Sequence, residues 1–201
     1  MNPLTLFKLF FTPTTGWNAL VKSRPSIHGL YLLHVIPFAL LASVMLYFSA
    51  SSHGGVLGIF PGKKLALVAI AFFLVQLIAV PAMAVIIRQL GEIADTQASF
   101  KDSFILAAVA PTPLWFLPII LVVPNTLVLL AALVLALLAS AGFIYYGVPA
   151  VFKIKEQGHA ILYFGGILIA GVVAAGFLMI CTLIIWSAVQ GLQFAPKLAG
   201  L

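Results

Sequence analysis

Long apolar stretches alternate with short polar connections along the chain. Five of these stretches are long enough to cross a hydrocarbon core of about 30 Å as a helix. Their predicted limits are residues 28–50, 65–87, 103–123, 126–148 and 161–189. The connections are too short for a separate soluble domain, and only Pro124-Asn125 separates the third stretch from the fourth. The pattern therefore predicts an all-α integral membrane protein with five transmembrane helices, the third and fourth forming an antiparallel hairpin.

A shorter amphipathic segment precedes the first long stretch. Its apolar residues recur at helical spacing around Lys8, at Leu4, Phe7, Phe10 and Phe11. A second short helix is expected after Thr12, which can cap it, with Pro13 in the first helical position. We expect both helices to lie flat on the cytoplasmic leaflet as an interfacial anchor, and the alternative is a sensor of curvature or lipid.

The composition supports a membrane protein and excludes a soluble one. Apolar residues make up 64% of the chain and charged residues only 7%, whereas soluble domains carry about 25% charged residues. Intrinsic disorder is excluded as well, because disordered chains are poor in aromatic residues and this one has 16 Phe. We divide the chain into an amphipathic interface segment (1–27), a transmembrane domain (28–190) and a short C-terminal tail (191–201).

The net charge of +6 comes from ten Lys and Arg against four Asp and Glu. The cations flank the spans and form no basic face for a nucleic acid to follow. One side of the membrane would hold Lys8, Lys22, Arg24, Arg88, Lys101, Lys153 and Lys155, and the other side only Lys63, Lys64 and Lys197. This asymmetry predicts a cytoplasmic N-terminus and an external C-terminus. Interfacial tyrosines on the cytoplasmic side would then be Tyr31, Tyr145, Tyr146 and Tyr163.

The third span contains a cluster of prolines, at Pro111, Pro113 and Pro118. Each proline removes a backbone donor and disfavours the helix, so a broken or strongly kinked span is predicted. The freed carbonyls need protein or water around them, because lipid supplies no donors. We interpret the break as a packed kink in which Thr112 supplies a local hydrogen bond. The alternative is a solute pathway, since broken helices line substrate sites in transporters.

The polar residues inside the spans are few, and no Asp, Glu, Lys or Arg falls at mid-span. We expect Gln76 to bond between helices rather than to hold a ligand. Pro81 frees the carbonyl of Leu77, which the Gln76 side chain is poorly placed to satisfy. His34 is interpreted as a satisfied buried or interfacial histidine rather than a metal ligand, because it lacks a second ligand at helical spacing.

Two faces of small residues indicate close helix packing. They recur every four positions, at Ala132, Ala136 and Ser140 and at Gly166, Ala170 and Ala174. We expect them to hold the bundle together, and a homodimer is the alternative.

No catalytic pattern is present in the sequence. It has no nucleophile elbow, zinc-binding helix or phosphate-binding loop, and its single cysteine, Cys181, lies in an apolar run. We therefore expect no enzyme activity, no catalytic residue, no metal and no cofactor.

All four acids lie in two loops, residues 88–103 and 149–160, beside four of the cations. Within the first loop, Ser99 and Asp102 fit a capping box that opens the third span. Two interpretations stay open: ordinary solvated loops, or a partner-binding surface formed by Arg88, Glu92, Asp95, Lys101, Asp102, Lys153 and Glu156.

The order of motifs resembles the Yip family, small five-span membrane proteins, and in particular its bacterial inner-membrane branch. The resemblance runs from about Phe7 to Trp186 and rests on Pro13 and Trp17, on Phe100-Lys101-Asp102-Ser103 before Ala110-Pro111-Thr112-Pro113, and on Tyr146-Gly147-Val148-Pro149. It implies a cytoplasmic N-terminus, and its eukaryotic members act in vesicle trafficking and bind Rab-type GTPases.

The leading hypothesis is a non-enzymatic membrane adaptor or scaffold. Its partners would be membrane lipid and either another protein or a second copy of the chain, with no nucleic acid. The rival hypothesis is a small-solute transporter or channel that uses the proline break, and it requires a wet cavity lined by polar groups at that break.

The distribution of cations makes a prediction about topology. A reporter that is active only in the cytoplasm should work when it is fused to the N-terminus and fail when it follows Leu201, because the cation-rich side faces inward. The opposite pair of results would reverse the orientation and contradict the resemblance.

Overall fold

The computed structural model describes residues 8–53, 62–123 and 125–198, and the regular elements in these ranges are helices. A helical turn at residues 8–11 comes first. It is followed by α2 (Pro13–Ser23), α3 (Ile27–Leu30), the π-helix η1 (Tyr31–Val35), α4 (Ile36–His53), α5 (Gly62–Ile93), α6 (Phe100–Val109), α7 (Thr112–Trp115), α8 (Leu117–Ile120), α9 (Thr126–Phe152) and α10 (Gln157–Leu198).

Five helical stretches are long and apolar enough to cross a membrane. They are Ile27–Ser49, Leu65–Ile93, Phe100–Ile120, Thr126–Phe152 and Gln157–Ile185. The predicted all-α fold, with short N-terminal helices followed by five transmembrane helices, is confirmed. Leu4, Phe7 and Pro124, on which parts of the prediction rested, lie outside the described residues.

The second span continues past its predicted end at residue 87. Helix α5 runs on to Ile93, and Arg88 and Glu92, one turn apart, form an exposed ion pair that adds a small support to this last part of the helix. The third and fifth spans likewise begin earlier than predicted, at Phe100 and Gln157. Charged and polar residues near a span end therefore belong to the helix rather than to the loop.

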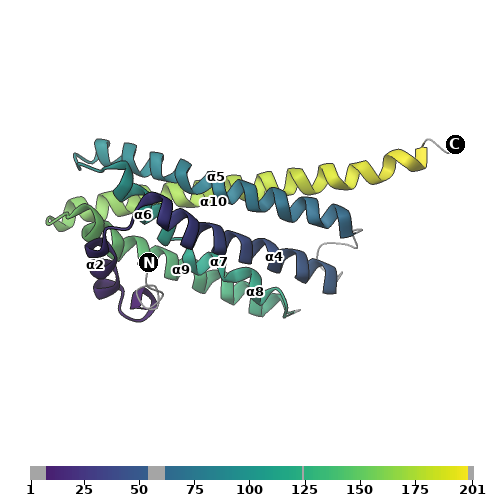
Figure 1. Ribbon diagram of the computed structural model, residues 1–201, viewed down its shortest axis with the longest axis horizontal. Coiled ribbons are helices and arrows are strands. Elements are labelled where there is room, and N and C mark those ends of the chain that lie inside the picture. The colour runs from purple at the N-terminus through teal and green to yellow at the C-terminus, as the bar shows by residue number, and fades with distance from the viewer. Residues whose placement is uncertain (1–7, 54–61, 124, 199–201) are drawn as a thin grey trace.

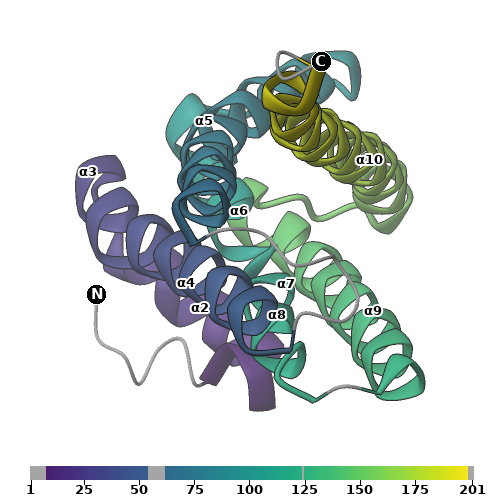
Figure 2. The same cartoon turned by 90° about the vertical axis from the view of Figure 1, so that its right-hand side faces the viewer.

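Helix α6 is the centre of the bundle. All of its residues from Ser103 to Val109 are buried, and it packs against α3, η1, α5 and α9. Figure 2 shows α6 behind and between α5 and α9, with α4 in front. By contrast, the large side chains of α9 and α10 that face away from the bundle are exposed, for example Leu135 and Leu162, as expected of helices that face lipid.

Two connections and the N-terminal helices share one end of the bundle. Figure 1 shows α2, the α5–α6 connection and the α9–α10 connection together at the left, whereas α10 extends to the right well past the other helices. We call the left-hand end the loop end. Helix α2 and both charged loops therefore lie on the same side of the bundle, as the alternation of five spans requires.

The small-residue face of α9 packs inside the chain, since Ala136 and Ser140 are buried. On α10, a Cβ added at Gly166 would meet the Leu90 side chain of α5 at 3.8 Å, but Gly166, Ala170 and Ala174 are only half-buried. The expected packing role is therefore seen for the α9 face, and a homodimer through the α10 face stays an alternative.

The amphipathic helix α2 uses its apolar face to pack on protein. Trp17 and Leu20 are fully buried, and α2 contacts α9. A Cβ at Gly147 of α9 would lie 2.8 Å from the indole of Trp17 and 2.6 Å from Leu106 of α6. The expected interfacial anchor is therefore docked on the bundle at a position where only glycine fits.

The start of α2 differs in one detail from the prediction. Pro13 occupies the first turn and Thr12 the N-cap position, but the Thr12 side chain caps no amide of α2. Its hydroxyl donates instead to the Lys8 carbonyl at 3.0 Å, because Thr12 also closes the preceding turn through its own amide. The expectation of side-chain capping by Thr12 was wrong.

The contact between Trp17 and Gly147 can be tested by overpacking. Gly147→Leu should destabilise the protein in detergent by about 1–3 kcal/mol, because the new side chain displaces a buried indole ring. Trypsin should then cleave faster after Lys22, because the helical backbone around this exposed side chain loosens once α2 undocks. Gly142→Leu is the matched control, since nothing lies within 4 Å of a Cβ at that position of the same helix. Equal stability and equal cleavage in both variants would show that α2 does not depend on this contact.

Candidate functional site

The proline cluster breaks the third span into three pieces. Helix α6 ends at Val109, and single turns α7 and α8 follow. Pro111 is the N-cap of α7, whereas Pro113 and Pro118 occupy the first turns of α7 and α8, where a missing amide hydrogen costs nothing. The predicted break at Pro111, Pro113 and Pro118 is confirmed.

A chain of hydrogen bonds supplies a donor to a carbonyl that the break leaves unpaired. The Thr112 hydroxyl donates to the Val109 carbonyl at 2.6 Å, which is the carbonyl that Pro113 leaves without a donor. The same hydroxyl oxygen lies 3.0 Å from Nε2 of His34 in η1. Because a hydroxyl has one proton and Thr112 gives it to Val109, Nε2 must carry a hydrogen and donate to Thr112.

His34 is thus a buried structural histidine, as predicted, with one difference. Its Nε2 atom is bonded, but Nδ1 has no hydrogen-bond partner in the described part of the chain. Among those residues no group of three or more His, Cys, Asp or Glu could hold a metal ion.

Aromatic rings fill the space beside the break. Trp115 stacks on Phe38 with ring centroids 5.9 Å apart, and the His34 ring meets Trp115 edge-on at 5.7 Å. The pocket beside Tyr145 and a small one beside Cys181 are lined by other residues. The surroundings of the break are those of a packed kink.

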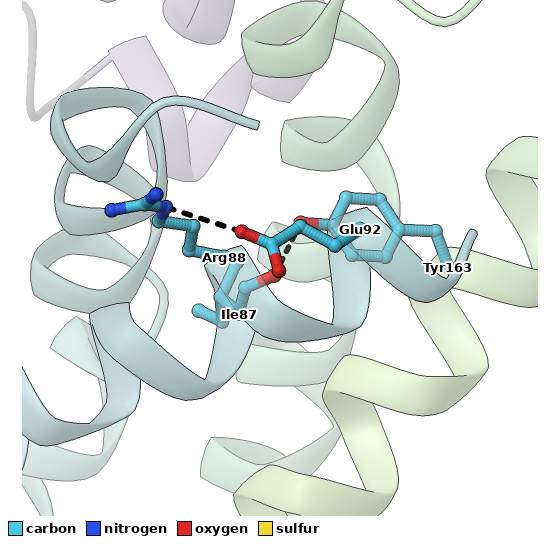
Figure 3. A network of polar contacts seen from close by, with 4 residues as sticks. All are labelled: Ile87, Arg88, Glu92 and Tyr163. Carbon is cyan, nitrogen blue, oxygen red and sulfur yellow. Dashed lines mark hydrogen bonds and ion pairs between the residues drawn. The ribbon is translucent and has the colours of Figure 1, made fainter. Parts of the chain in front are cut away.

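Two tyrosine hydroxyls donate hydrogen bonds to backbone carbonyls of α5, and the sequence analysis predicted neither bond. The Tyr31 hydroxyl donates to Leu77 at 2.9 Å, the carbonyl freed by Pro81. The Tyr163 hydroxyl of α10 donates to Ile87 at 2.7 Å, as Figure 3 shows. The proline at position 81 was a signal that a distant donor was needed, whereas nothing in the sequence marked Ile87.

Gln76 makes the contact between helices that was expected of it. Its side-chain amide donates to the Ser43 hydroxyl of α4 at 3.4 Å and to the Phe72 carbonyl of its own helix at 3.3 Å. Both contacts are long, so Gln76 adds less to helix association than the two tyrosines.

The charged residues at the loop end form what we call the loop surface: Arg88, Glu92, Asp95, Lys101, Asp102, Lys153 and Glu156. Within it Arg88 Nε lies 3.5 Å from Glu92, the pair drawn in Figure 3. Glu156 lies 3.3 Å from His159. Both pairs are exposed and local, and no ion pair among the described residues joins the two loops. The loops therefore share an end of the bundle without being locked together.

Three members of the loop surface also shape the chain. Asp95 and Lys153 take left-handed conformations, at φ 50° and 55°, and each follows the end of a helix. Ser99 caps α6 by accepting from the Asp102 amide at 3.1 Å, as predicted. The Asp102 carboxylate accepts from the Ser99 hydroxyl at 2.6 Å, so Asp102 helps to start the central helix.

The hydrogen-bond chain at the break leads to a stability prediction. Thr112→Val should cost about 1–3 kcal/mol, because the Val109 carbonyl and the His34 ring lose their partner where water cannot replace it. Thr182→Val is the matched control, since Thr182 bonds only to the Leu178 carbonyl of its own helix. The measurement is the unfolding midpoint in detergent. Equal losses in both variants would contradict a special role for Thr112.

Comparison with known proteins gives one match. A family model described as the Yip1 domain matches residues 7–179, whereas no curated protein and no solved structure matches the chain. The matched range contains the docked Trp17 and Gly147, the capped start of α6, the proline break and both charged loops. With a match over most of its length and five helices able to cross a membrane, the chain belongs to the Yip1 domain family of multi-pass membrane proteins.

Proposed function

We propose that this protein is a non-enzymatic membrane adaptor that binds a partner protein at the loop surface. The observation that carries the proposal is the placement of charge. All four acids of the chain lie in the two loops at the loop end, where Arg88, Glu92, Asp95, Lys153 and Glu156 are exposed. Charged groups of both signs give orientation and discrimination between partners, whereas apolar contacts give area.

An apolar contact point lies within the same surface. Ile93, at the end of α5 between Glu92 and Asp95, is 83% exposed. It follows the Arg88–Glu92 pair, at the end of the bundle where the charged loops replace the lipid-facing helix surface. An exposed aliphatic side chain surrounded by charges suits a small protein interface, in which a few residues carry most of the binding energy.

We further infer that the loop end faces the cytoplasm and that the membrane is a bacterial inner membrane. The first inference rests on the excess of cations in the N-terminal segment and the two loops, seven against three at the other end. The second rests on the resemblance to the bacterial branch of the family. The C-terminus would then lie in the periplasm.

Site-specific photo-crosslinking in intact membranes tests the proposal. A photoreactive residue at Glu92 or Ile93 should give a discrete adduct, because a bound partner would lie within reach of both. The control is Leu183, which is also exposed, at 60%, but lies within the apolar span of α10, and it should give none. An adduct of twice the chain mass would identify the partner as a second copy. Equal labelling at all three positions would contradict a partner at the loop surface.

Charge variants make the prediction quantitative. Glu92→Lys with Asp95→Asn should reduce adduct formation at Ile93 severalfold while changing stability by no more than about 1 kcal/mol, because exposed pairs contribute little. Asn is chosen because it tolerates the left-handed conformation of Asp95.

The matched variant exchanges the two partners of one pair, Arg88→Glu with Glu92→Arg. It keeps the net charge and the ion pair, so only a partner that reads the positions of the charges should lose binding. Unchanged adducts in both variants would show that these residues are merely solvated.

A further inference from the structure

A pocket at the loop end lies outside the loop surface and has no role in the adaptor proposal. It measures about 210 Å³ and lies between the last turns of α9 and the start of α10. Its lining includes Tyr145, Tyr146, Pro149, Lys155, Ala160 and Ile161. Pro149, Ala160 and Ile161 give the lining apolar surface, whereas Lys155 brings an ammonium group and the two tyrosines bring phenol rings.

The position of the pocket selects an amphipathic ligand. On one side lie the exposed charges of the α9–α10 connection, including Lys153 and Glu156. On the other side the exposed surfaces of α9 and α10 are apolar, with Leu138 and Leu162 both largely exposed. Tyrosine prefers this boundary between headgroups and hydrocarbon. The pocket therefore lies at the boundary between the charged connection and the apolar helix surfaces, where lipid headgroups are expected.

The electrostatics of the pocket favour an anion. Lys155 is the charged residue of the lining, and the nearby carboxylate of Glu156 lies 3.3 Å from the His159 ring. Helix α10 begins at Gln157, which lines the pocket, so the positive end of a long helix lies at its edge. The helix end and the ammonium group both favour the negative charge of a phosphate.

The volume restricts what can enter. Sites for drug-sized ligands measure about 300–1,000 Å³, so a pocket of about 210 Å³ holds a headgroup but not a whole lipid. The acyl chains would follow the exposed apolar surfaces of α9 and α10. We propose that this pocket binds the phosphate group of an anionic membrane phospholipid, as basic pockets between transmembrane helices can.

Native mass spectrometry of the full chain in detergent tests the proposal, with dioleoyl phosphatidylglycerol and dioleoyl phosphatidylcholine as probes. The protein should retain the anionic lipid more strongly than the zwitterionic one. Lys155→Gln should weaken retention of phosphatidylglycerol about fivefold, the effect of one cation near a lipid surface. Lys22→Gln is the matched control, since Lys22 lies in α2 at the same end of the bundle and does not line the pocket.

A steric variant separates the pocket from the surface charge. Ala160→Leu should abolish the preference by filling the cavity without changing any charge, whereas Ala175→Leu, on the exposed part of α10, should not. Equal retention of the two lipids, or equal losses for the two lysine variants, would overturn the proposal. Binding of inorganic phosphate that depends on Lys155, without a preference for phosphatidylglycerol, would assign the pocket to a free anion and also overturn it.

Discussion

A backbone carbonyl that a proline frees inside a membrane needs a donor from protein or water, because lipid offers none. This constraint organises the bundle. Pro81 leaves the Leu77 carbonyl without a helical donor, and the hydroxyl of Tyr31 in the first span donates to it. Pro113 does the same to the Val109 carbonyl, to which the neighbouring Thr112 hydroxyl donates. His34 of the first span is hydrogen-bonded to Thr112. Tyr31 and His34 both belong to the π-helix η1. Their hydrogen bonds therefore fix η1 against the second and the third span.

The same constraint explains which parts of the structure were predictable. The number of spans, the break, the Ser99 cap and the need for a donor at Leu77 follow from residues that are close together in the chain. The identity of that donor does not, because Tyr31 and Leu77 are 46 residues apart and His34 and Thr112 are 78 apart. Which polar groups meet depends on how the helices cross, and local patterning carries no information on crossing.

The docking of α2 shows a second limit. An amphipathic pattern states that one face is apolar but not whether lipid or protein covers it. The deciding residue was Gly147, more than a hundred positions away, which allows the indole of Trp17 to approach the α9 backbone. The loop surface shows the opposite case. Its position at one end of the bundle was predicted from the sequence, but only the structure shows that its charges pair within each loop and not between the loops. Asp102 was placed among partner-binding candidates although its carboxylate also fastens the start of the central helix.

The burial of α6 from Ser103 to Val109 has a consequence for biogenesis. A helix enclosed by other helices is not held in place by lipid, and the proline break that follows it carries freed carbonyls that stay unsatisfied until the third span packs on η1. In the chain α6 follows α5 and precedes α9. It therefore leaves the ribosome before α9, one of the helices that enclose it, has been synthesised. The insertion machinery must therefore hold α6 until α9 can pack against it. The short connection to α9 keeps this time brief, because α9 is the next long helix to be synthesised.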